Sequence, residues 1–491
     1  MSASKDKINR RQQIEAGTDK RTIAAEKAAK ERRKSTIQYV VIGVILVLFF
    51  AFIFLYNSSL PSRYTTAVTI DGQDYSVAEV NYYYSSSYMS FYNNYNSYIQ
   101  YGMFFDPSQS LADQEYSEGV SWRQYFLDAA VDSMTEIQLL NNAADEAGFV
   151  LPEAEQAEYE EAVESIRTNW ADYGYSSLKQ YINMNYGKGV TMELIEEQLY
   201  RTYRASAYSQ SVYDGYSYTN DELAAYYADH ADDMDMFTYS YYYVTDETMD
   251  AQAVAAAVNG TSEEEFAAYL AENFEDAAPS TLTYAGSDLS DVYGDWLRDA
   301  SRAPGDAAAI TDEDGEATYV VMFLGRDSGD YATVDFRHIL INAEDADGDG
   351  EYSEEEIAAA FDEAESLYEE WQNGAATEDS FAELANAYSE DGGSNTTGGL
   401  YENVYHGQMV EVINDWLFED GRQPGDTTVV TNDGSYTGTH VVYFVGTSDM
   451  TFAQYQADTA MRSEAYSSWM EEAEAAAEVT TRHMGMCGKN H

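Results

Sequence analysis

Two of the six histidines in the chain lie in short apolar segments that are typical of buried strands. His338 stands in the segment FRHILI (336–341), and His440 stands in GTHVV (438–442). A neutral imidazole has one donor and one acceptor nitrogen, so two facing imidazoles joined to a carboxylate and a hydroxyl group can set tautomers and polarity without any covalent step. A lone histidine in such a segment is more often a core residue whose ring nitrogens are hydrogen-bonded and that has no role in catalysis. The chemistry therefore requires that these two strands be neighbours.

A second set of residues has the spacing of a calcium-binding loop. Residues 345–356 (DADGDGEYSEEE) fit the twelve-residue EF-hand pattern at positions 1, 3, 5, 6, 9 and 12. Carboxylate oxygens and a glycine at the sharp turn are what Ca²⁺ requires, and a merely solvated acidic turn is the alternative. A strand rather than a helix precedes the loop, so we expect an EF-hand-like site for a structural ion. Its expected ligands are Asp345, Asp347, Asp349, Glu351 through its carbonyl, Ser353 and Glu356.

Two other chemistries receive little support from the sequence. The tail holds His483, Met484, Met486, Cys487 and His491, a mixture that could bind a soft metal, although such tails are more often disordered. Hydrolysis by a Ser-His-Asp set is not expected, because no nucleophile elbow accompanies the histidines.

The order of motifs around the two histidines resembles the parvulin family of peptidyl-prolyl isomerases. The resemblance covers Asp335 to about Gly446, and the helical segments on either side extend it to the PrsA/SurA class of secreted foldases. The segments that carry it, in chain order, are FRHILI (336–341), FAELA (381–385), YSEDGGS (388–394), GGL (398–400), GQMV (407–410), PGD (424–426) and GTHVV (438–442).

The resemblance implies a role for particular residues. His338 and His440 would be the paired central histidines, Asp391 would stand at the position that is Cys or Asp in the family, and Thr437 would supply a hydroxyl group. The residues expected to line a proline pocket are Leu400, Met409, Ile413 and Phe418, with Ile413 in place of the usual Phe. No cofactor is implied for catalysis. The acidic loop lies where phosphate-selective parvulins carry basic residues, so phosphorylated substrates are not expected.

The second half of the chain contains an internal repeat of about 120 residues. DWL (295–297), RAPGD (302–306) and YVVMFLG (319–325) have counterparts in DWL (415–417), RQPGD (422–426) and HVVYFVG (440–446). Each copy is expected to open with a strand, at 237–244 and 334–341. The first copy has Tyr residues where the second has His338 and His440. We therefore predict a parvulin-like fold without isomerase activity for 237–326.

The N-terminal part predicts a membrane anchor. Residues 37–56 form a run of twenty residues without a charge, long enough to span a bilayer at about 1.5 Å per residue. A cleaved signal peptide has a shorter apolar region and a small-residue cleavage site. Arg32, Arg33 and Lys34 precede the run, so the positive-inside rule predicts a single-pass protein with a cytoplasmic N-terminus and extracytoplasmic domains.

Charge divides the chain at this span. Residues 1–36 hold 11 of the 26 Lys and Arg but only 5 of the 87 Asp and Glu, which leaves 15 basic and 82 acidic side chains for the other 455 residues. Nucleic acid is excluded as a partner, because phosphate binding requires clustered basic residues. With one cysteine, Cys487, the chain has no internal disulfide.

Between the span and the repeat, a helical segment reaches to about residue 230. A strand and turn at 67–72 and a capping box at 76–79 are expected to open it. Residues 80–105 carry no charge and many Tyr, which indicates either a helical core with amphipathic rings at its surface or a cradle of aromatic side chains for unfolded segments. A last helix at about 452–477 is expected to pack against this segment.

These patterns predict an α+β protein with an N-terminal transmembrane helix, a helical chaperone-like domain and two tandem parvulin-like domains. The expected ranges are 1–36 for the basic segment, 37–56 for the anchor, 66–232 with 450–480 for the helical domain, 233–328 for the degenerate copy, 332–448 for the isomerase and 481–491 for the tail. We expect a foldase for unfolded secreted polypeptides. The alternatives are a non-enzymatic holdase and a calcium-binding scaffold.

Overall fold

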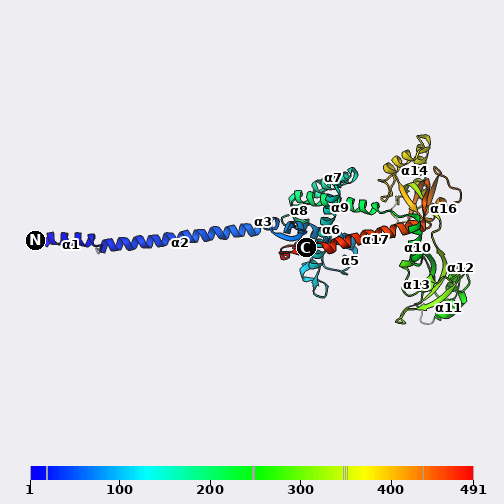
Figure 1. The fold of residues 1–491 in the computed structure, drawn as a ribbon, viewed down its shortest axis with the longest axis horizontal. Coiled ribbons are helices and arrows are strands. Elements are labelled where there is room, and N and C mark those ends of the chain that lie inside the picture. Colours follow the sequence, from blue (N-terminus) through cyan, green and yellow to red (C-terminus); the bar gives the residue numbers. More distant parts are fainter. Residues whose placement is uncertain are drawn as a thin grey trace. The chain divides into compact units, whose positions relative to one another are not determined.

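The computed structural model describes residues 2–17, 20–245, 249–346, 348, 350, 352–434 and 436–489. The chain divides into two compact units. The first unit comprises Met1–Gly215 together with Tyr466–His491, and the second comprises Tyr216–Ala465. The chain is α+β, with an N-terminal apolar helix, a helical region and two small domains that are each built on a four-stranded antiparallel sheet (Figure 1).

The first unit is mainly helical. Its principal elements are α1 (Ser2–Glu15), α2 (Lys20–Asn57), α3 (Leu60–Tyr64), β1 (Thr66–Ile70), β2 (Gln73–Ser76), α4 (Val77–Asn94), α5 (Asn96–Gln100), β3 (Glu115–Ser117), β4 (Val120–Ser121), α6 (Trp122–Ala147), α7 (Glu153–Thr168), α8 (Leu178–Asn185), α9 (Met192–Gly215) and β13 (Val479–Thr481).

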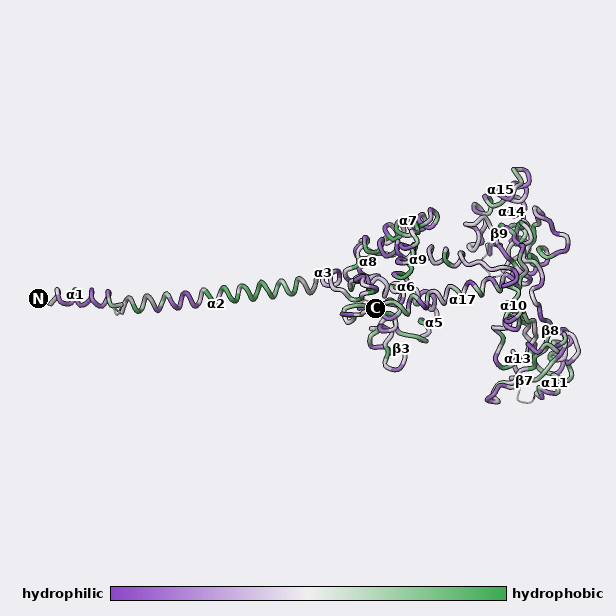
Figure 2. The backbone as a smooth tube through the Cα atoms, in the orientation of Figure 1, coloured by the Kyte–Doolittle hydropathy of each residue, from purple (hydrophilic) through white to green (hydrophobic). Residues whose placement is uncertain are grey.

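The long helix α2 contains the apolar run. Within the described residues, one helix is long and apolar enough to cross a membrane, at Lys27–Phe54, and none of its most apolar stretch is buried by the rest of the protein. Figure 2 shows this stretch as the continuous hydrophobic part of α2. An exposed apolar surface of this length is unfavourable in water, so this helix is a signal or an anchor.

Local sequence signals set the start of the helical region. The β1–β2 hairpin turns at Asp71-Gly72, as expected, and both residues have positive φ. Ser76 then accepts a hydrogen bond from the Glu79 N–H, and the Glu79 carboxylate accepts one from the Ser76 N–H at 2.6 Å, which is the predicted capping box.

The uncharged segment after this cap serves two purposes. Tyr82, Tyr83 and Tyr84 are buried in the core of the first unit, in agreement with a helical core. Further along the segment, Tyr95, Tyr98, Tyr101 and Phe104 are exposed. Tyrosine therefore fills the core at the start of α4 and covers the surface beyond it.

Residues 481–489 of the tail pack against the first unit, whereas disorder is the more common state of such a tail. The Cys487 side chain is fully buried among core residues, and the Arg123 guanidinium donates to the carbonyl oxygens of Met484, Cys487 and Gly488. Burial raises the pKa of the Cys487 thiol to about 11, so the thiol is protonated. The described residues contain no group of side chains that could hold a metal ion, and His491 lies outside them.

The second unit contains two four-stranded antiparallel sheets with equivalent strand order, β6-β5-β8-β7 and β10-β9-β12-β11. This equivalence confirms the repeat that the sequence predicts. The first sheet consists of β5 (Met236–Tyr243), β6 (Ser280–Ala285), β7 (Ala307–Thr311) and β8 (Thr318–Asp327). The second consists of β9 (Ala332–Asn342), β10 (Leu400–Val404), β11 (Thr427–Asp433) and β12 (Thr437–Thr451).

Helices complete each sheet domain. The first domain has α11 (Ala251–Val258), α12 (Glu263–Asn273) and α13 (Gly294–Arg298), and the second has α14 (Glu354–Asn373), α15 (Glu378–Tyr388) and α16 (Glu411–Leu417). Helix α10 (Asn220–Met234) precedes the first sheet, and α17 (Phe452–Ala476) follows the second. At the C-terminal end of α17, Met470 packs with Leu140 and Ala205 of the first unit, as the sequence predicts for the last helix.

The two faces of the second sheet pack against different partners. Ile339, Ile341 and Val441 face α14 and α15 in one apolar cluster. Phe336, Val442 and Phe444 lie on the opposite face and pack with α16. Because side chains alternate along a strand, His338 and His440 must share the face of Phe336 and Val442.

Candidate active site

The register of the two central strands brings the predicted histidines together. In the β9–β12 pair, His338 lies opposite Val442 and Leu340 lies opposite His440. The histidines are therefore diagonal neighbours on one face of the sheet. Their ring centroids are 5.2 Å apart, the rings are nearly parallel at 8°, and 3.0 Å separates the two Nδ1 atoms. The spatial requirement for the proposed chemistry is met.

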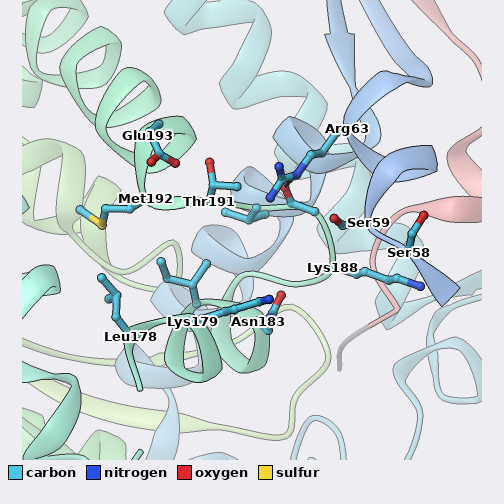
Figure 3. Close-up of a pocket in the computed structure, with 13 residues that line it drawn as sticks. Ser58, Ser59, Arg63, Leu178, Lys179, Asn183, Lys188, Thr191, Met192 and Glu193 are labelled. Carbon is cyan, nitrogen blue, oxygen red and sulfur yellow. Dashed lines mark hydrogen bonds between the residues drawn. The ribbon is translucent and has the colours of Figure 1, made fainter. Parts of the chain in front are cut away.

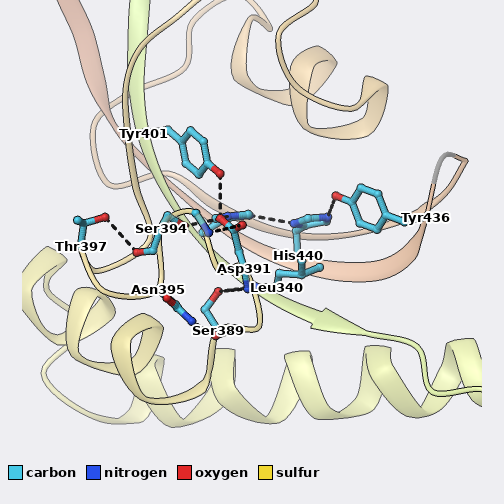
Figure 4. A network of polar contacts seen from close by, with 11 residues as sticks. Leu340, Ser389, Asp391, Ser394, Asn395, Thr397, Tyr401, Tyr436 and His440 are labelled. Carbon is cyan, nitrogen blue, oxygen red and sulfur yellow. Dashed lines mark hydrogen bonds and ion pairs between the residues drawn. The ribbon is translucent and has the colours of Figure 1, made fainter. Parts of the chain in front are cut away.

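A continuous polar network extends from the histidine pair in both directions (Figure 4). On one side, His338 Nε2 lies 2.8 Å from Asp391 Oδ2. On the other, His440 Nε2 lies 2.7 Å from the Tyr436 hydroxyl. Asp391 Oδ2 also accepts hydrogen bonds from the Tyr401 and Ser394 hydroxyls at 2.9 and 2.5 Å, and Oδ1 accepts one from the Gly393 N–H at 3.1 Å.

Two proton arrangements satisfy every donor and acceptor in this network. Asp391 is a carboxylate, so His338 Nε2 carries a proton in both. If His338 is neutral, its Nδ1 accepts from the His440 Nδ1–H, and His440 Nε2 accepts from the Tyr436 hydroxyl. If His338 is protonated, its Nδ1–H donates to His440, and His440 Nε2–H donates to the Tyr436 oxygen. One proton on His338 thus reverses the direction of the chain of hydrogen bonds.

Burial and hydrogen bonds shift the pKa values of the network. The hydrogen bond with His338, supported by those of Ser394, Tyr401 and Gly393, holds the pKa of Asp391 well below its usual range. Burial, aided by the nearby His338, lowers the pKa of His440 to about 3, so His440 is neutral at physiological pH. Burial and the adjacent Asp391 raise the pKa of Tyr401 to about 12, and the same two causes raise that of Tyr436.

The imidazoles themselves are almost completely enclosed. His338 is 3% exposed and His440 is 1% exposed, whereas Tyr436 is 37% exposed and the Asp391 side chain is 18% exposed. The polar route to solvent therefore passes through Tyr436 and Asp391.

An apolar cluster lies next to the imidazoles on the same face of the sheet. The Phe336 ring contacts the His338 ring at a centroid distance of 5.8 Å and stacks on Tyr401 at 5.4 Å. Met409 and Phe418 are partly exposed members of this cluster, as expected for residues that could contact a proline ring. Ile413 is fully buried, so it supports the cluster from beneath and does not form its surface.

At two of the predicted positions, Leu400 and Thr437, the adjacent residue in the sequence lies beside the imidazoles instead. Leu400 lies opposite Arg337, on the face away from the imidazoles, and Tyr401 lies opposite Phe336. Because Tyr401 pairs with Phe336, its side chain shares the face of the imidazoles. Thr437 lies opposite Asp433 in the β11–β12 hairpin, and the hydroxyl group that contacts His440 belongs to Tyr436. No sequence pattern identified Tyr436, because its contact depends on how the hairpin turn folds back over His440.

The predicted calcium loop is only partly within the described residues, since Asp347, Asp349 and Glu351 lie outside them. The Asp345 carboxylate accepts hydrogen bonds from the N–H groups of Gly348 and Gly350 at 2.6 and 2.9 Å. Glu356 accepts from the Ala346 and Ser353 N–H groups at 2.7 and 2.8 Å. The first and last carboxylates of the loop thus face its own backbone, and Gly348 and Gly350 take the positive φ values that the turn requires.

The fold and this network define the class of the domain. Residues 320–446 match the family described as PPIC-type PPIASE domain, so the chain contains a parvulin-type peptidyl-prolyl isomerase domain. No curated protein matches the chain.

Several solved structures of foldases are similar to this chain. They include the peptidylprolyl isomerase PrsA from Bacillus anthracis (11% identity, 70% of this chain and 94% of that one, TM-score 0.19) and the foldase PrsA from Streptococcus pneumoniae (10%, 74% and 91%, TM-score 0.24). A structure reported under the heading of two SurA-like chaperones of Campylobacter jejuni is also similar (8% identity, 54% and 82%, TM-score 0.17).

Proposed function

We propose that this protein is a membrane-anchored extracytoplasmic foldase that catalyses cis/trans isomerisation of X-Pro bonds in secreted polypeptides. The observation that carries the proposal is the His338–His440 pair within a PPIC-type domain. The two Nδ1 atoms are 3.0 Å apart, and hydrogen bonds to Asp391 and Tyr436 fix the two rings. The apolar helix α2 would be the anchor, with the basic residues before it in the cytoplasm.

Isomerisation of an X-Pro bond needs no covalent step, so a catalyst has to supply only a binding surface of the right shape and polarity. An X-Pro bond prefers trans by only about 0.5–1 kcal/mol, but its rotation crosses a barrier of about 18–20 kcal/mol, because twisting breaks amide resonance. A catalyst must bind the twisted amide better than either planar form. In this proposal the partly exposed Met409 and Phe418 hold the proline ring, and the buried Phe336 supports them from beneath. The Tyr436 hydroxyl and the imidazoles behind it supply donors and acceptors that are already oriented.

We propose that the preferred substrates are not phosphorylated. Asp391 is part of the network, the Glu390 carboxylate accepts a hydrogen bond from the N–H of Asn342 at the end of β9, and Glu344 and Asp345 follow one residue later. The guanidinium of Arg337 is on the opposite face, bound to Glu378 at 3.0 Å. A phosphate group would meet an acidic surface here. A Ser-Pro peptide and its phosphorylated form should therefore differ in turnover, in favour of the unmodified peptide.

The direct test is a refolding assay in which X-Pro isomerisation limits the rate. The full-length chain in detergent is expected to accelerate the slow phase, and His440→Ala should abolish that acceleration. The matched control is Tyr319→Phe, at the corresponding position of the first sheet domain, which should leave the acceleration intact. Equal acceleration by wild type and His440→Ala would refute the proposed site.

A holdase is the alternative, and the exposed aromatic residues of the first unit favour it. A cavity of about 510 Å³ is lined by Phe91, Tyr95, Phe104, Tyr116, Trp122 and Tyr125, together with Met103 and Glu115. Aromatic rings bury a large apolar area and keep a polar edge, which suits the transient binding of unfolded segments. Suppressed aggregation of an unfolded client without acceleration of refolding would identify a holdase.

We further propose that residues 345–356 bind a structural Ca²⁺. The support is the EF-hand spacing of six potential ligands and the positive φ of Gly350. An ion here would clamp the end of β9 to the start of α14. Calcium should raise the midpoint of thermal unfolding of the wild type and not that of Glu356→Gln, whereas magnesium should have little effect. An equal response of both chains to calcium would contradict this site.

A further inference from the structure

A hollow in the first unit opens beside the end of the apolar helix. Its volume is about 990 Å³. Ser58 and Ser59, directly after α2, form one wall. Helices α3 and α8, the loop 188–191 and the first turn of α9 contribute the others (Figure 3).

The lining is basic, in a part of the chain where basic residues are scarce. Residues 57–491 hold 15 Lys and Arg against 82 Asp and Glu, yet Arg63, Lys179 and Lys188 all line this one hollow. Glu193 is the one acidic residue of the lining. The hollow is therefore a local cationic site on a strongly anionic protein.

Two residues of the hollow are fixed by the backbone around them. Arg63 donates from Nε to the Gly189 carbonyl at 3.1 Å, which holds the guanidinium against the loop before α9. Gly189 has φ of +103°, and a Cβ atom there would lie 2.7 Å from the Ser62 Cβ, so α3 and this loop are in close contact. Thr191 accepts a hydrogen bond from the Leu194 N–H at the start of α9. The positive end of the α9 dipole adds to the field of the three cations.

The length of chain restricts where the hollow can be when α2 spans a membrane. The apolar run ends at Tyr56, and Ser58 and Ser59 follow two and three residues later. At no more than about 3.6 Å per residue, these serines lie within about 11 Å of the end of the span. The headgroup region begins where the hydrocarbon core ends and is several ångströms thick. The hollow is thus tethered at the level of lipid headgroups.

We propose that this hollow binds the headgroup of an anionic phospholipid, with its phosphodiester between Arg63, Lys179 and Lys188. This inference rests on the proposed membrane anchor. Among headgroups, a glycerol phosphodiester fits the lining best, because Glu193 can accept hydrogen bonds from free hydroxyl groups while the cations hold the phosphate. A choline headgroup carries a cation, which the three basic side chains repel.

The test uses the full-length chain in lipid nanodiscs and the lysines as reporters. The extracytoplasmic part contains three lysines, Lys179, Lys188 and Lys489, of which Lys489 lies outside the hollow. Acetylation rates are measured for each lysine by peptide mass spectrometry, in phosphatidylglycerol discs and in phosphatidylcholine discs. We expect roughly threefold or greater protection of Lys179 and Lys188 in phosphatidylglycerol, with Lys489 unchanged. Arg63→Gln should reduce this protection, and the control Arg482→Gln should not.

Each other outcome overturns the inference in a distinguishable way. Equal rates in the two lipids show that the hollow does not select an anionic headgroup, while the anchor stands. Equal protection by inorganic phosphate in phosphatidylcholine discs assigns the hollow to a soluble phosphate. A chain that does not enter the discs contradicts the anchor and this inference together, and its isomerase activity can still be measured.

Discussion

The two sheet domains share one backbone framework, the four-stranded sheet with its helices, and differ at the site of the histidine pair. In each, an Arg guanidinium lies over a Trp ring, at 4.5 Å for Arg302 and Trp296 and at 3.9 Å for Arg422 and Trp416. In each, the glycine after a proline donates its N–H at 2.8 Å to the carbonyl of a phenylalanine on the neighbouring strand. The corner between helix and sheet is thus the same in both copies.

The site positions hold different residues. Tyr241 and Tyr319 occupy the places of His338 and His440, with ring centroids 6.3 Å apart. Asp276, the counterpart of Asp391, is exposed. The frame therefore folds with or without a polar network. The polar network of the second domain is therefore not required to build the sheet.

The largest expected effect concerns a buried position that both domains fill differently. Ile413 is fully buried beneath the apolar cluster, and Tyr293 stands at the corresponding position among three other tyrosine rings. Ile413→Ala should lower the free energy of unfolding of the second unit by about 2–5 kcal/mol, through lost contacts and a cavity. Tyr293→Phe should cost at most about 1.5 kcal/mol. Urea unfolding monitored by fluorescence measures both, and a smaller loss for Ile413→Ala than for Tyr293→Phe would contradict this packing.

The next effect separates the two aspartates. Asp391→Ala leaves the buried His338 N–H without its acceptor, so stability should fall by about 1–3 kcal/mol. Asp276→Ala removes an exposed carboxylate and should change stability by no more than about 0.5 kcal/mol. The same unfolding measurement compares them. Equal losses would show that the polar network contributes no more to the free energy of unfolding than the exposed Asp276 does.

A third prediction concerns pH. The pKa of His440 is about 3 in the folded protein and 6.5 in its ordinary state. Below about pH 6.5, His440 binds a proton in the unfolded chain but not in the folded one. Its contribution to the free energy of unfolding is therefore fully present above that pH. It is lost as the pH falls toward 3, by up to about 1.4 kcal/mol per pH unit. His440→Phe should flatten the slope between pH 7 and 5. Tyr319→Phe in the first domain should leave the slope unchanged.

The smallest effect tests the hydroxyl group at the end of the network. Tyr436→Phe removes the bond to His440 Nε2 and should reduce kcat/KM by an amount equivalent to about 0.5–1.5 kcal/mol. Thr437→Val, at the residue that the sequence indicated, should have no such effect. If Thr437→Val is the more damaging change, the hairpin places its hydroxyl groups differently from this structure.

The sequence predicted the frame well because repeated strand and turn signals are local. The capping box at Ser76, the two opening strands and the last helix could all be identified from spacing alone. The histidine pair was also predictable, since β9 and β12 each place one imidazole in an apolar strand. Tyr401 was missed by one residue, which strand alternation turns into the opposite face of the sheet. The Tyr436 contact depends on the fold of the β11–β12 turn, and the packing of the tail depends on contacts with the distant Arg123, so no local pattern encodes either of them.

The most direct test of the account is exchange NMR on an Ala-Pro peptide, with the full-length chain at catalytic concentration. Cis and trans signals should exchange far faster with wild type than without protein. His338→Ala and His440→Ala should each lose about 10²-fold in this acceleration, whereas Tyr241→Phe and Tyr319→Phe should retain it. Undiminished exchange in the histidine variants, or loss of exchange in the tyrosine variants, would contradict the assignment of catalysis to the second domain.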